Sequence, residues 1–341
     1  MKNILITIFT FLVLLILSDL FFRLTGISEV SNNEIYEDIG RGRRKDLHYI
    51  KFNEGFSMGK FNSYRYLGPG YSKEKSRRTF RIALIGDSFV EGFQVFDRNH
   101  FRSILEDSLK IINNELAIEV LNFGRSGFDI GDMFCYYKLF VEDFKPDLYI
   151  YLVSENDFQV HNSDPLRPRL YYNDSLIVDN SLKDNVLVEY PLFEKAMQNS
   201  TVVNMSNNAR KVLVDGGYKR ILFDKFSKST RSINIESEED SFEVSNAVKI
   251  VINQISKTNV LIVNRGVLPL NQQISNQIKQ DSINYLDLSG KFEPTEENDP
   301  FYWEVTNKRG HLNNEGHIIL ANALFEYIVD IGLIESKSSS E

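Results

Sequence analysis

Four short blocks of this 341-residue chain could carry chemistry, and the first of them contains a serine. Ser88 follows an apolar run that ends at Gly86, so it lies between a predicted strand and the start of a helix. Backbone N–H groups at such a place favour a developing negative charge. On its own, the serine fits a structural turn as well as it fits a nucleophile.

The second and third blocks offer hydrogen-bond donors. Asn122–Phe123–Gly124–Arg125–Ser126–Gly127 contains glycines, which let the backbone approach a ligand and present an N–H group. It is not the nucleophile elbow G-x-S-x-G, because Phe128 stands where the last glycine would be. In Ser154–Glu155–Asn156–Asp157, the amide of Asn156 could donate to an oxyanion. Taken singly, both blocks also fit ordinary turns.

The fourth block contains His311, one of five histidines in the chain. Asn313 is a predicted N-cap and Glu315 lies in the first helical turn, so His311 is placed in the loop before a helix. That location suits a general base. His311, Glu315 and His317 fit no standard metal-ligand spacing, so we expect no metal and no cofactor.

An alternation of strands and helices places these blocks at one edge of a sheet. Strands are predicted at 80–85, 118–121, 148–153, 260–263 and 283–286, and helices at 101–112, 130–144, 244–255 and 318–331. Such alternation is typical of a parallel sheet covered on both faces, and ligands bind at the carboxyl ends of its strands. Separate loops would then bring a nucleophile, oxyanion donors and a base to one cleft.

Together the four blocks resemble the SGNH (GDSL-like) hydrolase superfamily, in composition and in order. Gly86–Asp87–Ser88 is similar to its first block, Gly127 to its glycine block, Asn156 to the Asn of its third block and His311 to its histidine block. The resemblance implies a flavodoxin-like three-layer α/β/α sandwich. It also implies that Ser88 is the nucleophile, that His311 is the base, and that Ser88 N–H, Gly127 N–H and the Asn156 amide form an oxyanion hole.

The chain departs from the family pattern at two places. Ser154 stands where the family has glycine, which is minor because Asn156 is the working residue. More seriously, the family places an Asp two or three residues before the histidine, and here Arg309 and Lys308 occupy those positions. His311 is then oriented either by a carboxylate of the preceding loop, Asp299 or Glu304, or by the backbone in a Ser-His dyad.

The amino-terminal segment is predicted to be a membrane anchor. The run from Ile4 to Phe22 is almost wholly apolar and would span roughly 28 Å as a helix. No signal-peptidase site follows it, so we expect an uncleaved anchor rather than a signal peptide. Lys2 favours an extracytoplasmic, periplasmic catalytic domain, whereas the basic run 41–45 argues for the reverse. We expect that basic run to be a solvated loop.

The remaining segments complete a division into an anchor (1–27), a stalk and packed extension (28–79), a hydrolase domain (80–335) and a disordered tail (336–341). Tyr64–Arg65 in the extension is similar to the membrane-anchored branch of the family that has a GDSF-type motif. Residues 158–240 form an insertion too long for a simple loop, and we expect a lid that contains a hairpin at 170–178. Cys135, the single cysteine, is expected to be buried and inert.

These features favour an ester hydrolase that removes an acyl group, such as acetyl, from an envelope glycan or lipid. An O-acyltransferase would use the same serine chemistry, and loss of the orienting acid would leave a non-catalytic scaffold protein. The net charge of −8 argues against nucleic acid as a partner.

Overall fold

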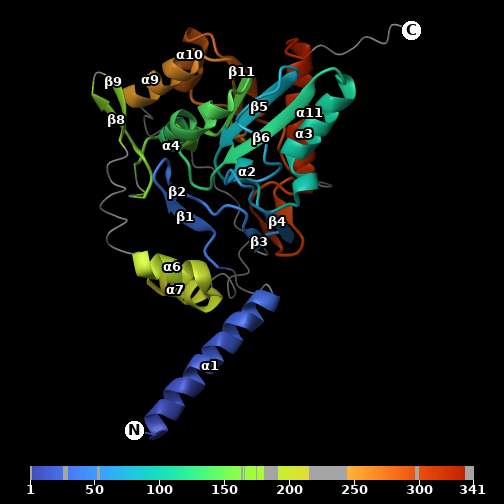
Figure 1. Ribbon diagram of the computed structural model, residues 1–341. Helices are drawn as coiled ribbons and strands as arrows, with labels where there is room; N and C mark the ends of the chain where they lie inside the picture. The colour runs from blue at the N-terminus through green and yellow to red at the C-terminus, as the bar shows by residue number, and fades with distance from the viewer. Residues whose placement is uncertain are drawn as a thin grey trace. The chain divides into compact units, whose positions relative to one another are not determined.

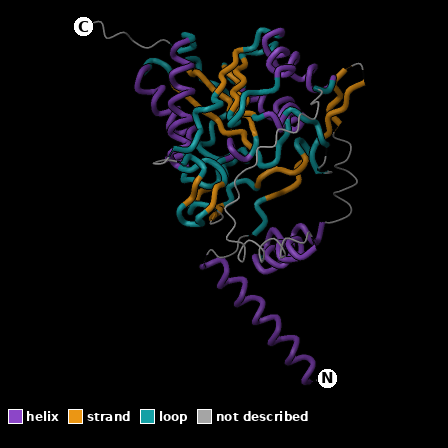
Figure 2. The backbone as a smooth tube through the Cα atoms, turned by 180° about the vertical axis from the view of Figure 1, so that it is seen from behind, coloured by secondary structure: helices purple, strands orange, loops and turns teal. Residues whose placement is uncertain are grey.

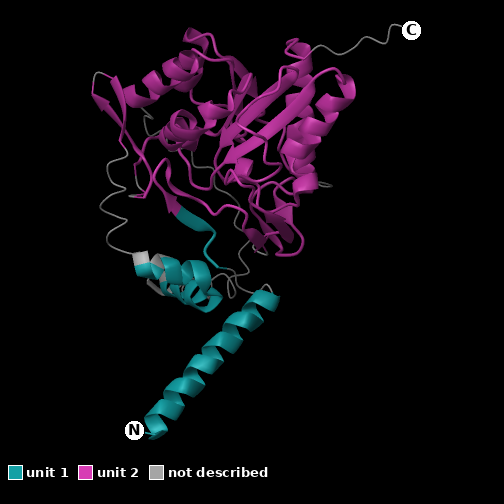
Figure 3. Ribbon diagram, in the orientation of Figure 1, with its two compact units in different colours: residues 1–34, 187–242 teal, residues 35–186, 243–341 magenta. Residues whose placement is uncertain are grey.

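The computed structural model describes residues 2–25, 30–51, 54–162, 164, 166–173, 175–179, 191–214, 244–295 and 299–334. The chain divides into two compact units (Figure 3). The smaller unit comprises residues 1–34 and 187–242, and the larger comprises residues 35–186 and 243–341. The insertion predicted at 158–240 is therefore divided between the two units. The tail at 336–341 lies outside the described residues.

The larger unit is built on a five-stranded parallel sheet (Figure 1). Its order is β11-β10-β7-β5-β6, and the strands are β5 (Thr79–Gly86), β6 (Ala117–Gly124), β7 (Leu148–Val153), β10 (Val260–Asn264) and β11 (Asn284–Asp287). Gly86, at the end of β5, is level with Gly124 of β6 and Leu152 of β7. The carboxyl ends of β5, β6 and β7 therefore lie side by side.

Helices cover both faces of this sheet, which confirms the predicted three-layer α/β/α architecture (Figures 1 and 2). On one face lie α3 (Phe101–Ile112) and α11 (Asn314–Asp330); on the other lie α4 (Ile130–Tyr136), α9 (Asn246–Ile255) and α10 (Gln272–Gln280). Side chains alternate along a strand, so each buried strand supplies apolar residues to both layers.

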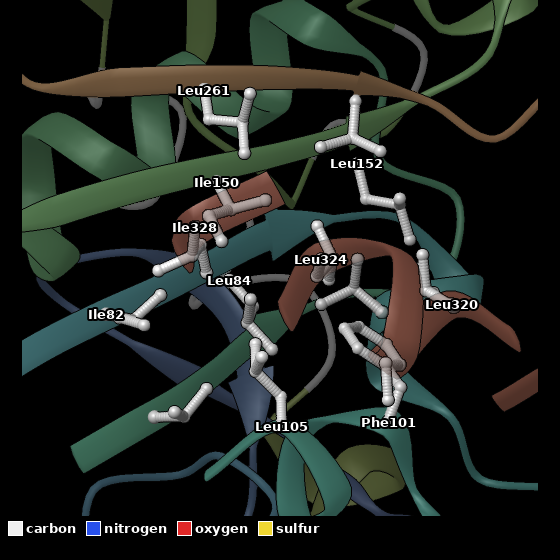
Figure 4. Close-up of a cluster of buried hydrophobic side chains, with 14 of the residues drawn as sticks. Ile82, Leu84, Phe101, Leu105, Ile150, Leu152, Leu261, Leu320, Leu324 and Ile328 are labelled. Carbon is white, nitrogen blue, oxygen red and sulfur yellow. The ribbon is translucent and has the colours of Figure 1, made fainter. Parts of the chain in front are cut away.

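The layer formed by α3 and α11 shows why these residues form these elements. Leu105 of α3 and Leu324 of α11 are fully buried against Leu84 of β5 (Figure 4). Burial of one such leucine contributes about 1.5–3 kcal/mol. The α3 helix starts at His100, whose side chain accepts a hydrogen bond from Arg102 N–H at 3.0 Å.

The described residues of the extension that precedes the sheet form short strands. It contains β1 (Asn33–Tyr36), β2 (Gly40–Arg43), β3 (His48–Lys51) and β4 (Ser57–Lys60), and β3 pairs with β4 in an antiparallel hairpin. Behind that hairpin lies a small apolar cluster that includes Tyr49, Phe61 and Phe93. Since Phe93 follows the first block of the site, the extension packs directly against the segment that carries Ser88.

The five strands and four helices expected from the sequence are present, with shifts at their ends. The helix predicted at 130–144 is α4 followed by a π-helical turn (Tyr137–Val141) and a 3₁₀ turn (Glu142–Phe144). The hairpin predicted at 170–178 is present as β8 (Arg169–Asn173) and β9 (Ser175–Asp179). The α10 helix was not predicted. Its apolar face is short, with Ile274 and Ile278 buried.

In the smaller unit, α1 (Lys2–Thr25) packs against α7 (Thr201–Val214), which follows α6 (Pro191–Asn199). The α1 helix is long and apolar enough to cross a membrane or to be a signal sequence. Its one acidic residue, Asp19, accepts hydrogen bonds from the N–H and Oγ1 of Thr201, at 2.6 and 2.9 Å, and from Ser200 Oγ at 2.9 Å. Asp19 therefore caps the amino end of α7.

Candidate active site

Ser88 is the first residue of α2 (Ser88–Glu91), directly after β5. The side chain of Asp87 caps this short helix by accepting a hydrogen bond from Phe89 N–H at 2.9 Å. Gly124 of β6 allows α2 to lie close to the sheet, because a β-carbon there would overlap the backbone of Val90 and Glu91. The hydroxyl of Ser88 is thus held at the carboxyl edge of the sheet.

His311 lies in the loop before α11, as predicted, and contacts this serine. Ser88 Oγ and His311 Nε2 are 2.8 Å apart, although 223 residues separate them in sequence. The α11 helix begins at the N-cap Asn313, whose side chain accepts from Glu315 N–H and Gly316 N–H at 3.0 Å. The imidazole is partly buried, with 28% of its side chain exposed.

The other ring nitrogen of His311 contacts a carboxylate from the extension. His311 Nδ1 lies 2.9 Å from both Oε1 and Oε2 of Glu54, and the backbone N–H of His311 donates to Glu54 Oε2 at 3.1 Å. Asp299 and Glu304 do not take this place. Asp299 pairs with Arg309 at 2.9 Å, and Glu304 is exposed. The expectation that the preceding loop supplies an acid was therefore wrong, as was a dyad oriented by backbone alone.

The charge states follow from these contacts. Burial opposes ionisation of Glu54, but its hydrogen bond and charge attraction with His311 outweigh burial and lower the pKa of the carboxyl. An ionised carboxylate can only accept hydrogen bonds, so His311 Nδ1–H donates to Glu54. In a neutral imidazole, Nε2 is then the acceptor for the Ser88 hydroxyl. This is the tautomer that a general base requires.

Two glycines and a tryptophan hold Glu54 and His311 together. A side chain at Gly310 would overlap the Glu54 carboxylate, and one at Gly55 would overlap the ring of Trp303. The indole N–H of Trp303 donates to the carbonyl of His311 at 2.9 Å. Trp303 therefore contacts both Gly55, which follows Glu54, and His311.

A charged network ties the loop that contains Asn156 to the start of α2. Arg265, directly after β10, donates to Asp87 Oδ2 at 2.6 Å and lies 3.3 Å from Asp157 Oδ2. Burial raises the pKa of Asp157 to about 6, opposed by Arg265 and assisted by Asp87. Asn156 itself lies in the 3₁₀ turn η4 (Glu155–Asp157) and is exposed.

Gly127 lies in the loop after β6 with a φ of 74°, a left-handed conformation that favours glycine. Its carbonyl accepts from Arg167 Nη1 at 2.8 Å, and Arg167 Nη2 donates to the carbonyl of Ser126 at 3.1 Å. Arg167 belongs to the start of the insertion, so that part of the insertion lies against the glycine loop. The stretches 180–190 and 215–243 lie outside the described residues.

The basic run at 41–45 is not a solvated loop, contrary to our expectation. Arg43 makes a bidentate pair with Glu91, at 2.6 and 2.7 Å, and Glu91 is 2% exposed. Ser126 donates to the same carboxylate through its N–H at 2.9 Å and through its hydroxyl. Burial disfavours the ionised form, but Arg43 above all lowers the pKa of Glu91 to about 2. The run is ordered because it neutralises a buried carboxylate.

A pocket of about 360 Å³ opens at these groups. The residues lining it include the serine, the histidine and the acid, two cations and one aromatic residue, namely Ser88, His311, Glu54, Arg43, Lys51 and Phe93, together with Gly55, Gln94 and Ser126. Neither Gly127 nor Asn156 is among the described residues that line it. The structure therefore joins Ser88, His311 and Glu54, and places the two further oxyanion candidates on loops at the same edge.

Other reactive side chains lie in the core. Cys135 is 1% exposed, and burial raises the pKa of its thiol, in agreement with the predicted inert cysteine. His317 is also buried and accepts from Phe101 N–H at 3.2 Å. Burial and then His100 hold its pKa well below the usual value. Among the described residues, no group of three or more His, Cys, Asp or Glu could hold a metal ion.

No protein-family model and no curated protein sequence matches this chain. Among solved structures, it is similar to a putative lipolytic protein of the G-D-S-L family from Desulfitobacterium hafniense DCB-2 (12% identity, TM-score 0.37, 73% of this chain and 99% of that one). It is also similar to an acetylxylan esterase from Geobacillus stearothermophilus (13%, 0.38, 77% and 100%) and to a lipase/acylhydrolase from Enterococcus faecalis (14%, 0.39, 76% and 100%). These values are too low to transfer an activity, so the proposal for function rests on the contacts of the site.

Proposed function

We propose that the protein is a serine ester hydrolase in which Ser88 is the nucleophile, His311 the base and Glu54 the residue that orients the base. The observation that carries this proposal is the unbroken hydrogen-bond chain from Ser88 through His311 to Glu54, with separations of 2.8 and 2.9 Å. The presence of an acid beside His311 removes the main argument for a non-catalytic scaffold.

The reaction proceeds in two steps. Ser88 Oγ attacks the ester carbonyl carbon while its proton passes to His311 Nε2, and the carbonyl becomes an oxyanion. The carbon–oxygen bond of the ester then breaks, and His311 gives its proton to the leaving alcohol. Water attacks the resulting acyl-Ser88 in the same way and releases the acid. The Ser88 and Gly127 N–H groups and the Asn156 amide are proposed to stabilise the oxyanion as substrate binds.

The substrate is proposed to be a small acyl ester, such as an acetyl ester, of an envelope glycan or lipid. A pocket of about 360 Å³ lies near the lower end of the range for ligand pockets, and Arg43 and Lys51 line part of it. A small acyl group fits such a polar chamber better than a long hydrocarbon chain, which would desolvate these cations without compensation.

The test is turnover of 4-nitrophenyl acetate together with labelling by a fluorophosphonate probe. The wild-type chain should hydrolyse the ester and become labelled at Ser88. Ser88→Ala should abolish both, because it removes the nucleophile. Absence of turnover and of labelling in the wild type would refute the esterase.

We also propose that α1 anchors the protein and that the larger unit is periplasmic. The α1 helix has the length and apolar composition of a membrane span. Membrane fractionation and protease protection on spheroplasts test this arrangement. The larger unit should be digested by added protease before lysis, and resistance until lysis would reverse the orientation.

A further inference from the structure

A second pocket adjoins the catalytic pocket. It measures about 630 Å³ and shares Gly55 and Gln94 with the catalytic pocket. We call it the side pocket; its walls come from the segments 55–56, 94–99, 299–305 and 313–315. All of these segments belong to the larger unit. The reaction at Ser88 does not require the side pocket. The residues that line this pocket therefore indicate which further part of a substrate the protein binds.

Residues near His311 line the side pocket, while His311 itself lines the catalytic pocket. His311 gives its proton to the oxygen of the leaving alcohol, so the alcohol part of an ester lies on the histidine side of Ser88. Asn313 and Asn314, just after His311, line the side pocket, and so does Trp303, which donates to the His311 carbonyl. The catalytic pocket is then left for the acyl group.

Aromatic and hydrogen-bonding side chains share the lining. Phe56 and Tyr302 are 48% and 37% exposed, and Phe96 packs edge-on against Phe56 with ring centroids 5.9 Å apart. Beside them lie the amides of Asn99 and Asn314, which are 3.3 Å apart. Aromatic rings can pack against the C–H faces of a ligand, while amides both donate and accept hydrogen bonds.

Carboxylates also line the side pocket and decide between a sugar and a lipid. Asp299, Glu304 and Glu315 line it together with Arg98, and Arg309 pairs with Asp299. A hydrocarbon chain would desolvate these charges and amides without offering them a hydrogen bond. The hydroxyl groups of a sugar would form hydrogen bonds with both the charged side chains and the amides. The lining carries no excess of positive charge, so it does not select an anionic sugar.

We propose that the side pocket binds a neutral sugar residue, so that the substrate is an O-acylated glycan whose acyl group enters the catalytic pocket. This inference rests on the proposed esterase and names its substrate class. Tyr302 packs against the sugar ring and Asn314 bonds its hydroxyls. The polarity of this lining argues against a lipid alcohol or a long acyl chain at the same place.

The test compares two activities of the full-length chain in detergent. One substrate set is mono-O-acetylated cello-, xylo-, manno- and chito-oligosaccharides, and the other is 4-nitrophenyl acetate, which has no sugar. In Tyr302→Ala/Asn314→Ala, the ratio of kcat/KM for the preferred oligosaccharide to that for 4-nitrophenyl acetate should fall about tenfold, as expected for one ring contact and one hydrogen bond. Asn322→Ala, an exposed asparagine on the same helix α11, is the matched control and should leave the ratio unchanged.

The outcomes separate this inference from the esterase itself. An unchanged ratio in the double variant, or preference for 4-nitrophenyl dodecanoate over every acetylated oligosaccharide, would overturn the sugar site while leaving the esterase intact. Binding of the unacetylated oligosaccharides, measured by saturation-transfer NMR, gives a readout that needs no turnover. If the wild type binds the oligosaccharides but hydrolyses no ester, and the double variant does not bind them, the sugar site is retained and the hydrolase is rejected.

Discussion

Glu54→Gln is the change that tests the site most directly, since it alters one atom of the hydrogen-bond chain. The amide oxygen of glutamine can still accept from the His311 backbone N–H, as Glu54 Oε2 does at 3.1 Å. Its NH₂ group, however, would donate toward Nδ1, where the carboxylate now accepts at 2.9 Å. That donor favours the tautomer with the proton on Nε2, which cannot take the proton of Ser88, against the one remaining oxygen near Nδ1.

The expected loss is about 10³–10⁴-fold in kcat, equal to roughly 4–5.5 kcal/mol of transition-state stabilisation, by analogy with loss of the same acid in a serine protease. The value of KM should change little, because Glu54 orients His311 and makes no bond to the leaving group. The rate of fluorophosphonate labelling should fall in parallel with kcat, while the melting temperature stays within a few degrees of the wild type.

The assay is hydrolysis of 4-nitrophenyl acetate by wild type, Glu54→Gln and the control Glu326→Gln, which changes an exposed acid of α11 that lines neither pocket. Lys308→Asp is a second control. It places an acid three residues before His311, yet it should bring no gain, because Glu54 already accepts from Nδ1. If the wild type is active and Glu54→Gln retains more than about a tenth of its kcat, Glu54 does not orient the base.

Two further changes probe other parts of the site. Asn156→Ala should lower kcat for the same ester about 10²–10³-fold, the cost of one oxyanion donor, and an effect below threefold would remove Asn156 from the oxyanion hole. Glu91→Gln should destabilise the fold by about 3–5 kcal/mol in urea unfolding at pH 7, because it removes the charge of a buried carboxylate that makes a bidentate pair with Arg43. Because the pKa of Glu91 is lowered to about 2, the ionised carboxylate stabilises the fold fully above pH ~4, and this stabilisation is lost as the pH falls through 2. The free energy of unfolding of the variant should therefore decline less steeply between pH ~4 and 2 than that of the wild type. Parallel declines in the two proteins would contradict the role of Glu91.

The sequence predicted the sheet well because its buried strands are mostly apolar runs. The stretches that became β5, β7 and β10 are almost wholly buried, and such runs between turn residues have few alternatives. The α10 helix was missed because only two buried residues mark its inner face. The contact between Ser88 and His311 followed from their places at a strand end and before a helix.

Glu54 could not be found in the same way. It lies in a loop between the short strands β3 and β4, where neither periodicity nor a motif distinguishes it from other acids of the extension. The useful signals were indirect: cations at Lys308 and Arg309 where an acid is usual, and a glycine at 310 beside the histidine. Only tertiary packing shows that Gly310 leaves room for a carboxylate from a distant segment.

The cap that Asp19 provides makes the amino end of α7 depend on α1. A leader peptidase that removed α1 would also remove the carboxylate that accepts from Ser200 and Thr201, and the amino end of α7 would keep unsatisfied N–H groups. The amino-terminal helix thus supplies part of the hydrogen bonding of the smaller unit. Loss of the amino-terminal helix would therefore remove a hydrogen-bond acceptor from Thr201, which lies 182 residues further along the chain than Asp19.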